Sequence, residues 1–203
     1  MGRRITILGM GPSALRKADV IEQFCEGTEV WSLNNAYLMY PQMRGKFARF
    51  FELHSWEYLK SWTPGKYLGE PVDHWAMLEQ QECPVYSMGI LPIVTNQKTY
   101  PAAEVVKQFS TNGSLEIKGS PSWMLALALY EHANGDPIEY IQSWGIDTSD
   151  PSHECQRPSW AQWTLRAEMS GIEIGGTALE FRKEPDNDAG LNGLLEYTLK
   201  HQE

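Results

Sequence analysis

Two histidines of this chain stand close to a carboxylate in the sequence, an arrangement that suits proton transfer. His54 follows Glu52 by two residues at the end of an apolar run, and residues two apart on a strand share a face. Such a pair could act as acid and base or contribute to a metal site, although two ligands alone do not make one. His153 stands beside Glu154 in a polar loop and could serve as a general base, because histidine titrates near neutral pH. We expect Glu52 and His153 to be catalytic.

A glycine-containing turn follows the first predicted strand. The apolar run 5–8 ends in the sequence GMGPS at 9–13, and a helical pattern comes next. A strand that opens onto a helix start leaves backbone N–H groups at a positive dipole end, which suits a phosphate. A dinucleotide fingerprint needs glycine where this chain has Ala14, and no P-loop lysine follows. The turn is either an ordinary strand-to-helix connection or a nucleotide loop that uses Gly9, Gly11, Pro12 and Ser13.

Polar residues also follow the other predicted strands. In open α/β sheets, ligands bind beyond the carboxyl ends of the strands, so these residues are expected to gather there. Asparagine amides can bind a base edge or ribose hydroxyls, serines at a helix start can bind phosphate, and the arginine fork matches phosphate or carboxylate oxygens. Each is also an ordinary turn or capping residue. Asp147 could hold Mg²⁺ or a ribose and is expected to be catalytic and metal-binding. The other expected ligand contacts are Asn34, Asn35, His54, Ser120, Ser122, Gln156 and Arg157.

Apolar runs alternate with helical patterns along the chain. This alternation predicts an α/β fold, a Rossmann-like three-layer sandwich whose mostly parallel sheet carries helices on both faces. One domain is expected over 1–203. Serine at 120 is expected to cap a helix, and Ala103, Val106 and Phe109 to form the buried side of another. The expected strands are 5–8, 29–33, 47–53, 84–87, 138–144 and 172–174, and the expected helices are 13–25, 100–109, 122–133 and 159–169.

Two segments depart from the alternation of strands and helices. Residues 54–84 are rich in Trp, Tyr, Pro and Gly, and we interpret them as an inserted helical cap over the carboxyl edge of the sheet. Five tryptophans outside the central strands either pack the core and the cap or form a stacking platform for a base or sugar. They are Trp56, Trp62 and Trp75 of this cap, and Trp160 and Trp163 further along the chain. Residues 182–203 are expected to form a polar tail.

Composition excludes several classes of function. The net charge of −9 argues against nonspecific nucleic-acid binding, which depends on neutralising phosphates with Lys and Arg. The three cysteines are far apart, which disfavours zinc or redox chemistry. No apolar run approaches the ~18 residues of a membrane span, and Arg3 and Arg4 lead directly into a strand rather than a signal sequence. We expect a cytoplasmic protein without a membrane partner. The sequence is compatible with a monomer or an oligomer.

The order of these motifs resembles that of two related groups of proteins. Residues 7–13, ILGMGPS, are similar to the glycine-proline-serine opening of the bacterial single-domain sialyltransferases and of the MptE-like, 6-hydroxymethylpterin diphosphokinase-like group. Residues 31–35 resemble their second strand, which ends in asparagine. Residues 119–128 and 144–147 resemble their small-residue helix start and Gly-Ile-Asp strand end. Residues 156–159, QRPS, look like a motif of small phage-encoded proteins.

The resemblance to the sialyltransferases implies a glycosyl-transfer site. In those enzymes the loops that match 9–13, Asn34 and Ser120 hold a CMP-sugar, and a histidine after the Gly-Ile-Asp strand is the base. His153 is the matching candidate here. By resemblance, therefore, this chain would bind a nucleotide-sugar and transfer its sugar.

The resemblance to the diphosphokinases implies pyrophosphoryl transfer instead. Carboxylates hold Mg²⁺ in that group, and the best match is Asp147, with Glu52 also possible. We therefore expect a nucleotide-dependent transferase that binds a nucleoside phosphate at the carboxyl edge of the sheet, with Mg²⁺ in the phosphoryl version. The alternative is a non-catalytic binder, of a phage-encoded type, that sequesters a nucleotide-derived small molecule.

Overall fold

A seven-stranded parallel sheet organises the protein. The computed structural model describes residues 2–11, 14, 20–61, 65–67, 70–110, 115–147 and 153–176. Every strand pair within this sheet is parallel, in the order β7-β6-β3-β2-β1-β8-β9. The strands are β1 (Arg3–Leu8), β2 (Glu29–Leu33), β3 (Arg49–Phe51), β6 (Val85–Ser87), β7 (Gln97–Thr99), β8 (Ile138–Trp144) and β9 (Glu173–Gly176).

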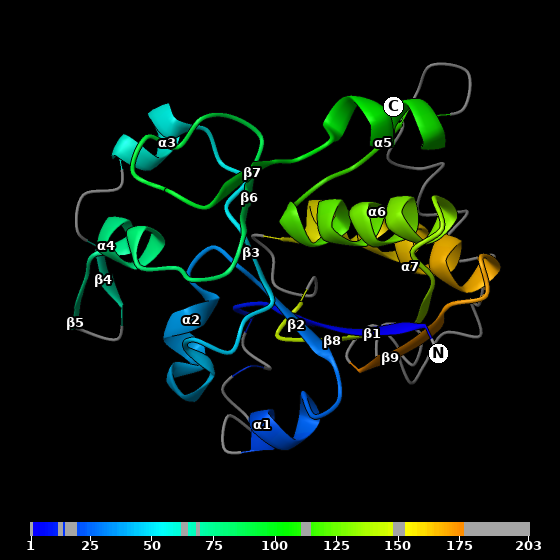
Figure 1. Cartoon of the computed structure of the whole chain (residues 1–203), viewed down its shortest axis with the longest axis horizontal. Helices are drawn as coiled ribbons and strands as arrows, with labels where there is room; N and C mark the ends of the chain where they lie inside the picture. Colours follow the sequence, from blue (N-terminus) through cyan, green and yellow to red (C-terminus); the bar gives the residue numbers. More distant parts are fainter. Residues whose placement is uncertain are drawn as a thin grey trace.

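Helices cover both faces of the sheet, which confirms the predicted Rossmann-like α/β sandwich. In Figure 1, α5, α6 and α7 lie on one side of the central strands, and α1 and α2 lie on the other. Within the described residues, no helix has the length and apolar character needed to cross a membrane. The elements outside the sheet are α1 (Ile21–Phe24), α2 (Ala36–Met39), the 3₁₀ turns η2 (Pro41–Met43) and η3 (Glu154–Gln156), α5 (Ala102–Phe109), α6 (Ser120–Ala133) and α7 (Arg157–Met169).

The alternation of side chains along the strands divides the core in two. Ile7 and Phe51 are buried with the helices α5, α6 and α7. Their sequence neighbours Leu8 and Phe50 are buried on the opposite face with α1 and α2. Successive side chains of a strand point to opposite faces, so apolar runs of consecutive residues are needed to fill both layers.

Three details differ from the sequence-based expectation. Phe109 of α5 packs against the core as predicted, but Val105 is buried in place of Val106, which is 38% exposed, and Ala102 packs on the core in place of the exposed Ala103. The helix α6 has Gly119 as its N-cap, because Ser120 is already helical. The strand β7 was not predicted, since its sequence QKT is polar and largely exposed at the edge of the sheet.

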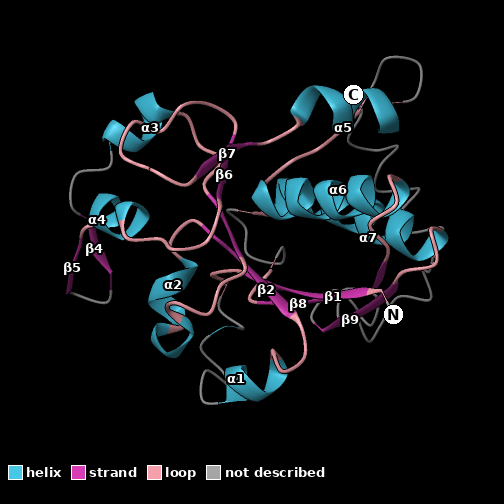
Figure 2. Ribbon diagram, in the orientation of Figure 1, coloured by secondary structure: helices cyan, strands magenta, loops and turns pink. Residues whose placement is uncertain are grey.

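The predicted cap lies between β3 and β6 in the sequence. It contains α3 (Trp56–Ser61), the antiparallel pair β4 (Gly65–Tyr67) and β5 (Glu70–Val72), and α4 (His74–Glu79), which gather at the left of Figures 1 and 2. Leu59 and Leu78 are buried in the same core as Phe50, so the cap packs onto the sheet domain. The rings of Trp56 and Trp75 meet edge to face at 4.4 Å, which joins α3 to α4.

Some predictions fall on parts of the chain that the structure does not describe. These are Pro12 and Ser13 of the glycine turn, most of the helix expected over 13–25, Trp62 of the cap, and the tail over 182–203.

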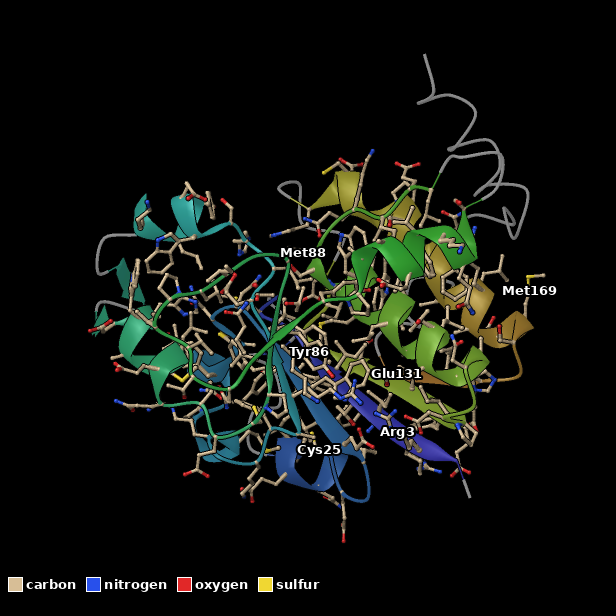
Figure 3. All side chains as sticks on the ribbon, turned by 45° about the horizontal axis from the view of Figure 1, so that its top comes forward. Arg3, Cys25, Tyr86, Met88, Glu131 and Met169 are labelled. Atoms are coloured by element: carbon tan, nitrogen blue, oxygen red, sulfur yellow. The ribbon has the colours of Figure 1, made fainter. Side chains whose placement is uncertain are left out.

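Ion pairs connect the amino ends of β1, β2 and β3 to the carboxyl end of α6. Arg3 binds Glu29 at 2.7 Å and Glu131 at 2.8 Å, and Figure 3 shows Arg3 close to Glu131. Arg49 also binds Glu131, at 2.6 Å, and lies over the ring of Trp31. The hydrogen bond from Arg3 holds the pKa of Glu29 below its ordinary value despite partial burial. This network stabilises the edge of the sheet opposite the candidate site.

Candidate functional site

One pocket lies beyond the carboxyl ends of β1, β2 and β8. Its volume is about 350 Å³, within the range of pockets that bind small molecules. Seven further residues of its wall were not among the predicted contacts: Met10, Leu33, Gly119, Pro121, Gly145, Ile146 and Trp160. Nine predicted site residues line it: Gly9, Gly11, Asn34, His54, Ser120, Ser122, Asp147, His153 and Gln156.

Three other predicted residues lie off the pocket wall. Glu52 is fully buried behind His54, which it contacts. Asn35 begins the turn into α2, and Arg157 begins α7. Neither Asn35 nor Arg157 belongs to the lining residues. Any contact that they make with a ligand of this pocket would have to be indirect.

The glycine turn joins β1 to β8. Gly9 donates its N–H to the carbonyl of Trp144 at 2.8 Å, and Gly11 donates to the carbonyl of Gly145 at 2.7 Å. A Cβ atom at Gly9 would collide with the Gly145 carbonyl, and one at Gly11 would collide with the side chain of Asp147. Glycine is therefore required for close approach of the two loops. The N–H groups of Gly9 and Gly11 are engaged by backbone carbonyls, so a phosphate needs other donors.

The start of α6 supplies such donors. The first N–H groups of a helix have no intrahelical partner and stand at the positive end of its dipole. Gly119, Ser120, Pro121 and Ser122 form this start and all line the pocket. Gly119 has a φ of 79°, and a Cβ there would overlap the side chain of Gln156. Glycine therefore lets the helix begin against η3 at the pocket wall.

Two polar atoms at the pocket have no hydrogen-bond partner among the described residues. Trp160 is 2% exposed, and its indole Nε1 is buried without an acceptor. The side-chain Oδ1 of Asn34 is buried without a donor. Asn34 is also the one non-glycine residue of the described chain with a positive φ, 47°. Asparagine tolerates this backbone conformation, but a buried polar atom without a partner is costly, so a ligand that reached these two atoms would satisfy them.

His54 is oriented by a buried carboxylate. Its Nδ1 lies 2.6 Å from Oε1 of Glu52, which is 0% exposed. An ionised carboxylate only accepts hydrogen bonds, so Nδ1 donates and Nε2 is left as the basic nitrogen of the neutral ring. Burial raises the pKa of Glu52, but hydrogen bonds from His54 and His74 outweigh it and lower the pKa below its ordinary value. The buried carboxylate therefore stays charged at neutral pH.

His153 lies elsewhere on the pocket wall. It is exposed and precedes η3, whose last residue, Gln156, also lines the pocket. The pocket thus offers two histidines, of which His54 is held by a buried carboxylate. The role of general base that the resemblance implies for His153 stays a prediction.

The described residues do not build a metal site by themselves. No three His, Cys, Asp or Glu residues gather as metal ligands in the described chain. Asp147 is the one carboxylate among the lining residues. Mg²⁺ is commonly bound by one or two carboxylates together with substrate phosphates, so a metal here would have to arrive with a phosphorylated ligand.

Sequence reasoning missed His74, Gly145 and Trp160. His74 lies in the cap, 22 residues from its partner Glu52, and no periodic pattern joins the two. Gly145 stands in the recognised Gly-Ile-Asp segment, which could have indicated a close approach to the glycine turn. Trp160 was interpreted as a packing residue or part of a stacking platform, and nothing in the sequence shows that its N–H lacks an acceptor.

The fold defines a Rossmann-like parallel α/β protein with a pocket at the carboxyl edge of its sheet. Comparisons with protein-family models, with characterised proteins and with solved structures find no match to this chain. No family is therefore identified, and the function has to be argued from the residues of the site.

Proposed function

We propose that this protein transfers a glycosyl group from a nucleotide-sugar to a hydroxyl acceptor, with His54 as general base. The observation that carries this proposal is the 2.6 Å hydrogen bond between His54 and the fully buried Glu52 at the wall of the pocket. A base that a second group orients is a recurrent feature of sites that activate hydroxyl nucleophiles. A protein that only sequesters a ligand has no need for an oriented base.

The proton follows a simple path in this proposal. Nε2 of His54 takes the proton of the acceptor hydroxyl as its oxygen attacks the anomeric carbon. The bond from that carbon to the donor phosphate breaks, and the nucleoside phosphate leaves with the electron pair. His54 becomes an imidazolium, whose charge the carboxylate of Glu52 stabilises.

The part of the pocket wall formed by the start of α6 suits the leaving phosphate. The start of α6 presents backbone N–H groups, the hydroxyls of Ser120 and Ser122 lie at this helix start, and Trp160 adds an indole N–H. These groups are fixed before the reaction and stabilise the negative charge that develops on the leaving group. None of the described lining residues is Lys or Arg, so phosphate binding would depend on neutral donors.

Pyrophosphoryl transfer fits the described residues less well. That reaction spreads charge over the transferred group and depends on metal ions and cations to compensate it. Among the described lining residues, Asp147 is the one carboxylate, and none is Lys or Arg. In glycosyl transfer the negative charge develops on the leaving phosphate alone, so the reaction requires fewer cations at this site.

Calorimetric titration tests the binding step. CMP is expected to bind, and Trp160→Phe to weaken it about tenfold or more, because a hydrogen bond to a charged group contributes about 1.5–3 kcal/mol. Cytidine, which lacks the phosphate, should not distinguish the variant from the wild type. The titration is repeated with CDP, CTP and ATP, with and without Mg²⁺.

Trp163→Phe is the matched control. Trp163 lies on the same helix and is also buried, but its Nε1 donates to the carbonyl of Glu116 and not to the pocket. This variant should bind CMP as the wild type does. Absence of binding by any of these nucleotides at millimolar concentration would exclude the proposed function.

A further inference from the structure

We infer that His74 of the cap is a positioning residue, which holds Glu52 and thereby fixes the proton of His54 on Nδ1. The inference rests on the proposed function only for its effect on turnover, because the geometry of the group stands by itself. It assigns the cap segment a part in the site through the contact of His74 with Glu52.

The two oxygens of Glu52 each bind one histidine. Oε1 lies 2.6 Å from Nδ1 of His54, and Oε2 lies 2.8 Å from Nε2 of His74. The backbone N–H of His54 also donates to Oε1, at 3.2 Å. A carboxylate with one oxygen held from each side cannot rotate without breaking a hydrogen bond. The contact with His74 therefore fixes the plane of the carboxylate and the direction in which Oε1 faces His54.

When both imidazoles are neutral, the carboxylate of Glu52 sets the hydrogen-bond directions within this group. Because the carboxylate only accepts, Nε2 of His74 donates, and Nδ1 of the neutral ring is an acceptor. The hydroxyl of Tyr37 lies 3.3 Å from that Nδ1 and its ring stacks on His74 at 5.8 Å. Burial raises the pKa of Tyr37 to about 12, so the hydroxyl keeps its proton and donates. Tyr37 therefore donates a hydrogen bond to His74, and His74 donates one to Glu52. His54 donates a separate hydrogen bond to Glu52.

The cap places His74 by means of a helix start. His74 is the first residue of α4, and the preceding Asp73 caps this helix by accepting from the N–H of Ala76 at 3.0 Å. His74 is 5% exposed and Tyr37 2%, so both partners are buried with Glu52, which is fully buried. Burying an ionised carboxylate is costly unless it is hydrogen-bonded. His54 hydrogen-bonds one oxygen of Glu52, and His74 hydrogen-bonds the other.

A purely structural contact and a positioning contact predict different results. If His74 only anchors the cap, its loss weakens the fold and leaves the tautomer of His54 unchanged. If His74 positions Glu52, its loss lets the carboxylate turn, and the proton of His54 redistributes between Nδ1 and Nε2. The tautomer of His54 is therefore the decisive readout, and it needs no nucleotide.

The test is ¹⁵N NMR of histidine-labelled protein at a pH where the imidazoles are neutral. The chain has five histidines, and the signal of His54 is identified by its loss in His54→Asn. The wild type should show His54 as the Nδ1–H tautomer, and His74→Phe a mixture. His74→Gln should restore the wild-type tautomer, because its amide can donate to Glu52 and accept from Tyr37. An unchanged tautomer in folded His74→Phe, or a mixture in His74→Gln, would overturn the inference.

His74→Leu is the second variant, for the case that His74→Phe does not fold. It also removes the donor to Oε2 of Glu52, so the tautomer of His54 should become mixed; an unchanged one would also overturn the inference. In turnover, His74→Phe should lower kcat on the order of 10- to 100-fold and leave KM nearly unchanged, as for loss of a supporting hydrogen bond. A shifted tautomer without any nucleotide binding would refute the proposed function and leave the positioning role supported.

Discussion

His54→Ala is expected to lower kcat for release of CMP from a CMP-sugar by about 100- to 10,000-fold, the usual contribution of a general base. The acceptor hydroxyl then has to lose its proton without the nitrogen that Glu52 orients. Affinity for CMP itself should change little, because the start of α6 and Trp160 hold the phosphate in this account. Initial rates and calorimetric titrations on the same preparations measure the two effects.

His153→Ala is the comparison that decides which of the two histidines is the general base. His153 lines the same pocket but is exposed, so its loss is expected to have a smaller effect on kcat than the loss of His54. If His153→Ala carries the large loss and His54→Ala does not, the base is His153, as the resemblance to the sialyltransferases implies. If neither variant changes turnover, base catalysis by a histidine of this pocket is wrong.

Gly145→Ala is expected to lower the free energy of unfolding by about 2–5 kcal/mol. Its φ of 71° costs a residue with a side chain about 1–2 kcal/mol. Its Cβ would also collide with the carbonyl of Gly9 and the hydroxyl of Tyr40, and overpacking of this kind typically adds about 1–3 kcal/mol. Because the clash involves backbone, the β1 and β8 loops have to separate, which also widens the pocket. Urea denaturation measures the loss.

Gly27→Ala is the matched control for this prediction. Gly27 has a φ of 70°, and a Cβ there would meet nothing within 4 Å. It therefore incurs the backbone strain alone, about 1–2 kcal/mol. Equal losses in the two variants would show that the close approach of Gly9 and Gly145 does not contribute to stability.

The sequence predicted the position of the site better than its internal contacts. Polar residues after separate strands converge in one pocket because parallel strands end at the same edge, so topology alone brings Asn34, Ser120 and Asp147 together. The strands themselves were recognisable because both faces of the sheet are buried. That physical requirement leaves continuous apolar runs in the sequence.

Contacts that depend on tertiary packing could not be predicted. Glu52 and His54 were paired as residues on one face of a strand, but β3 ends at Phe51, and the turn that follows brings the two side chains together. His74 reaches Glu52 from the cap, whose placement on the sheet no local pattern encodes. The sequence allowed the glycine turn to be either a strand-to-helix connection or a nucleotide loop, because the hydrogen bonds of its N–H groups to Trp144 and Gly145 are long-range contacts.

A crystal structure of the protein with CMP tests the central claim most directly. The account predicts the phosphate at the start of α6, within hydrogen-bond distance of Ser120 or Ser122 and of Nε1 of Trp160. It also predicts that the oxygen which would bear the sugar faces the side of the pocket that holds His54. A phosphate bound outside this pocket, or an empty pocket in crystals saturated with CMP, would contradict the account.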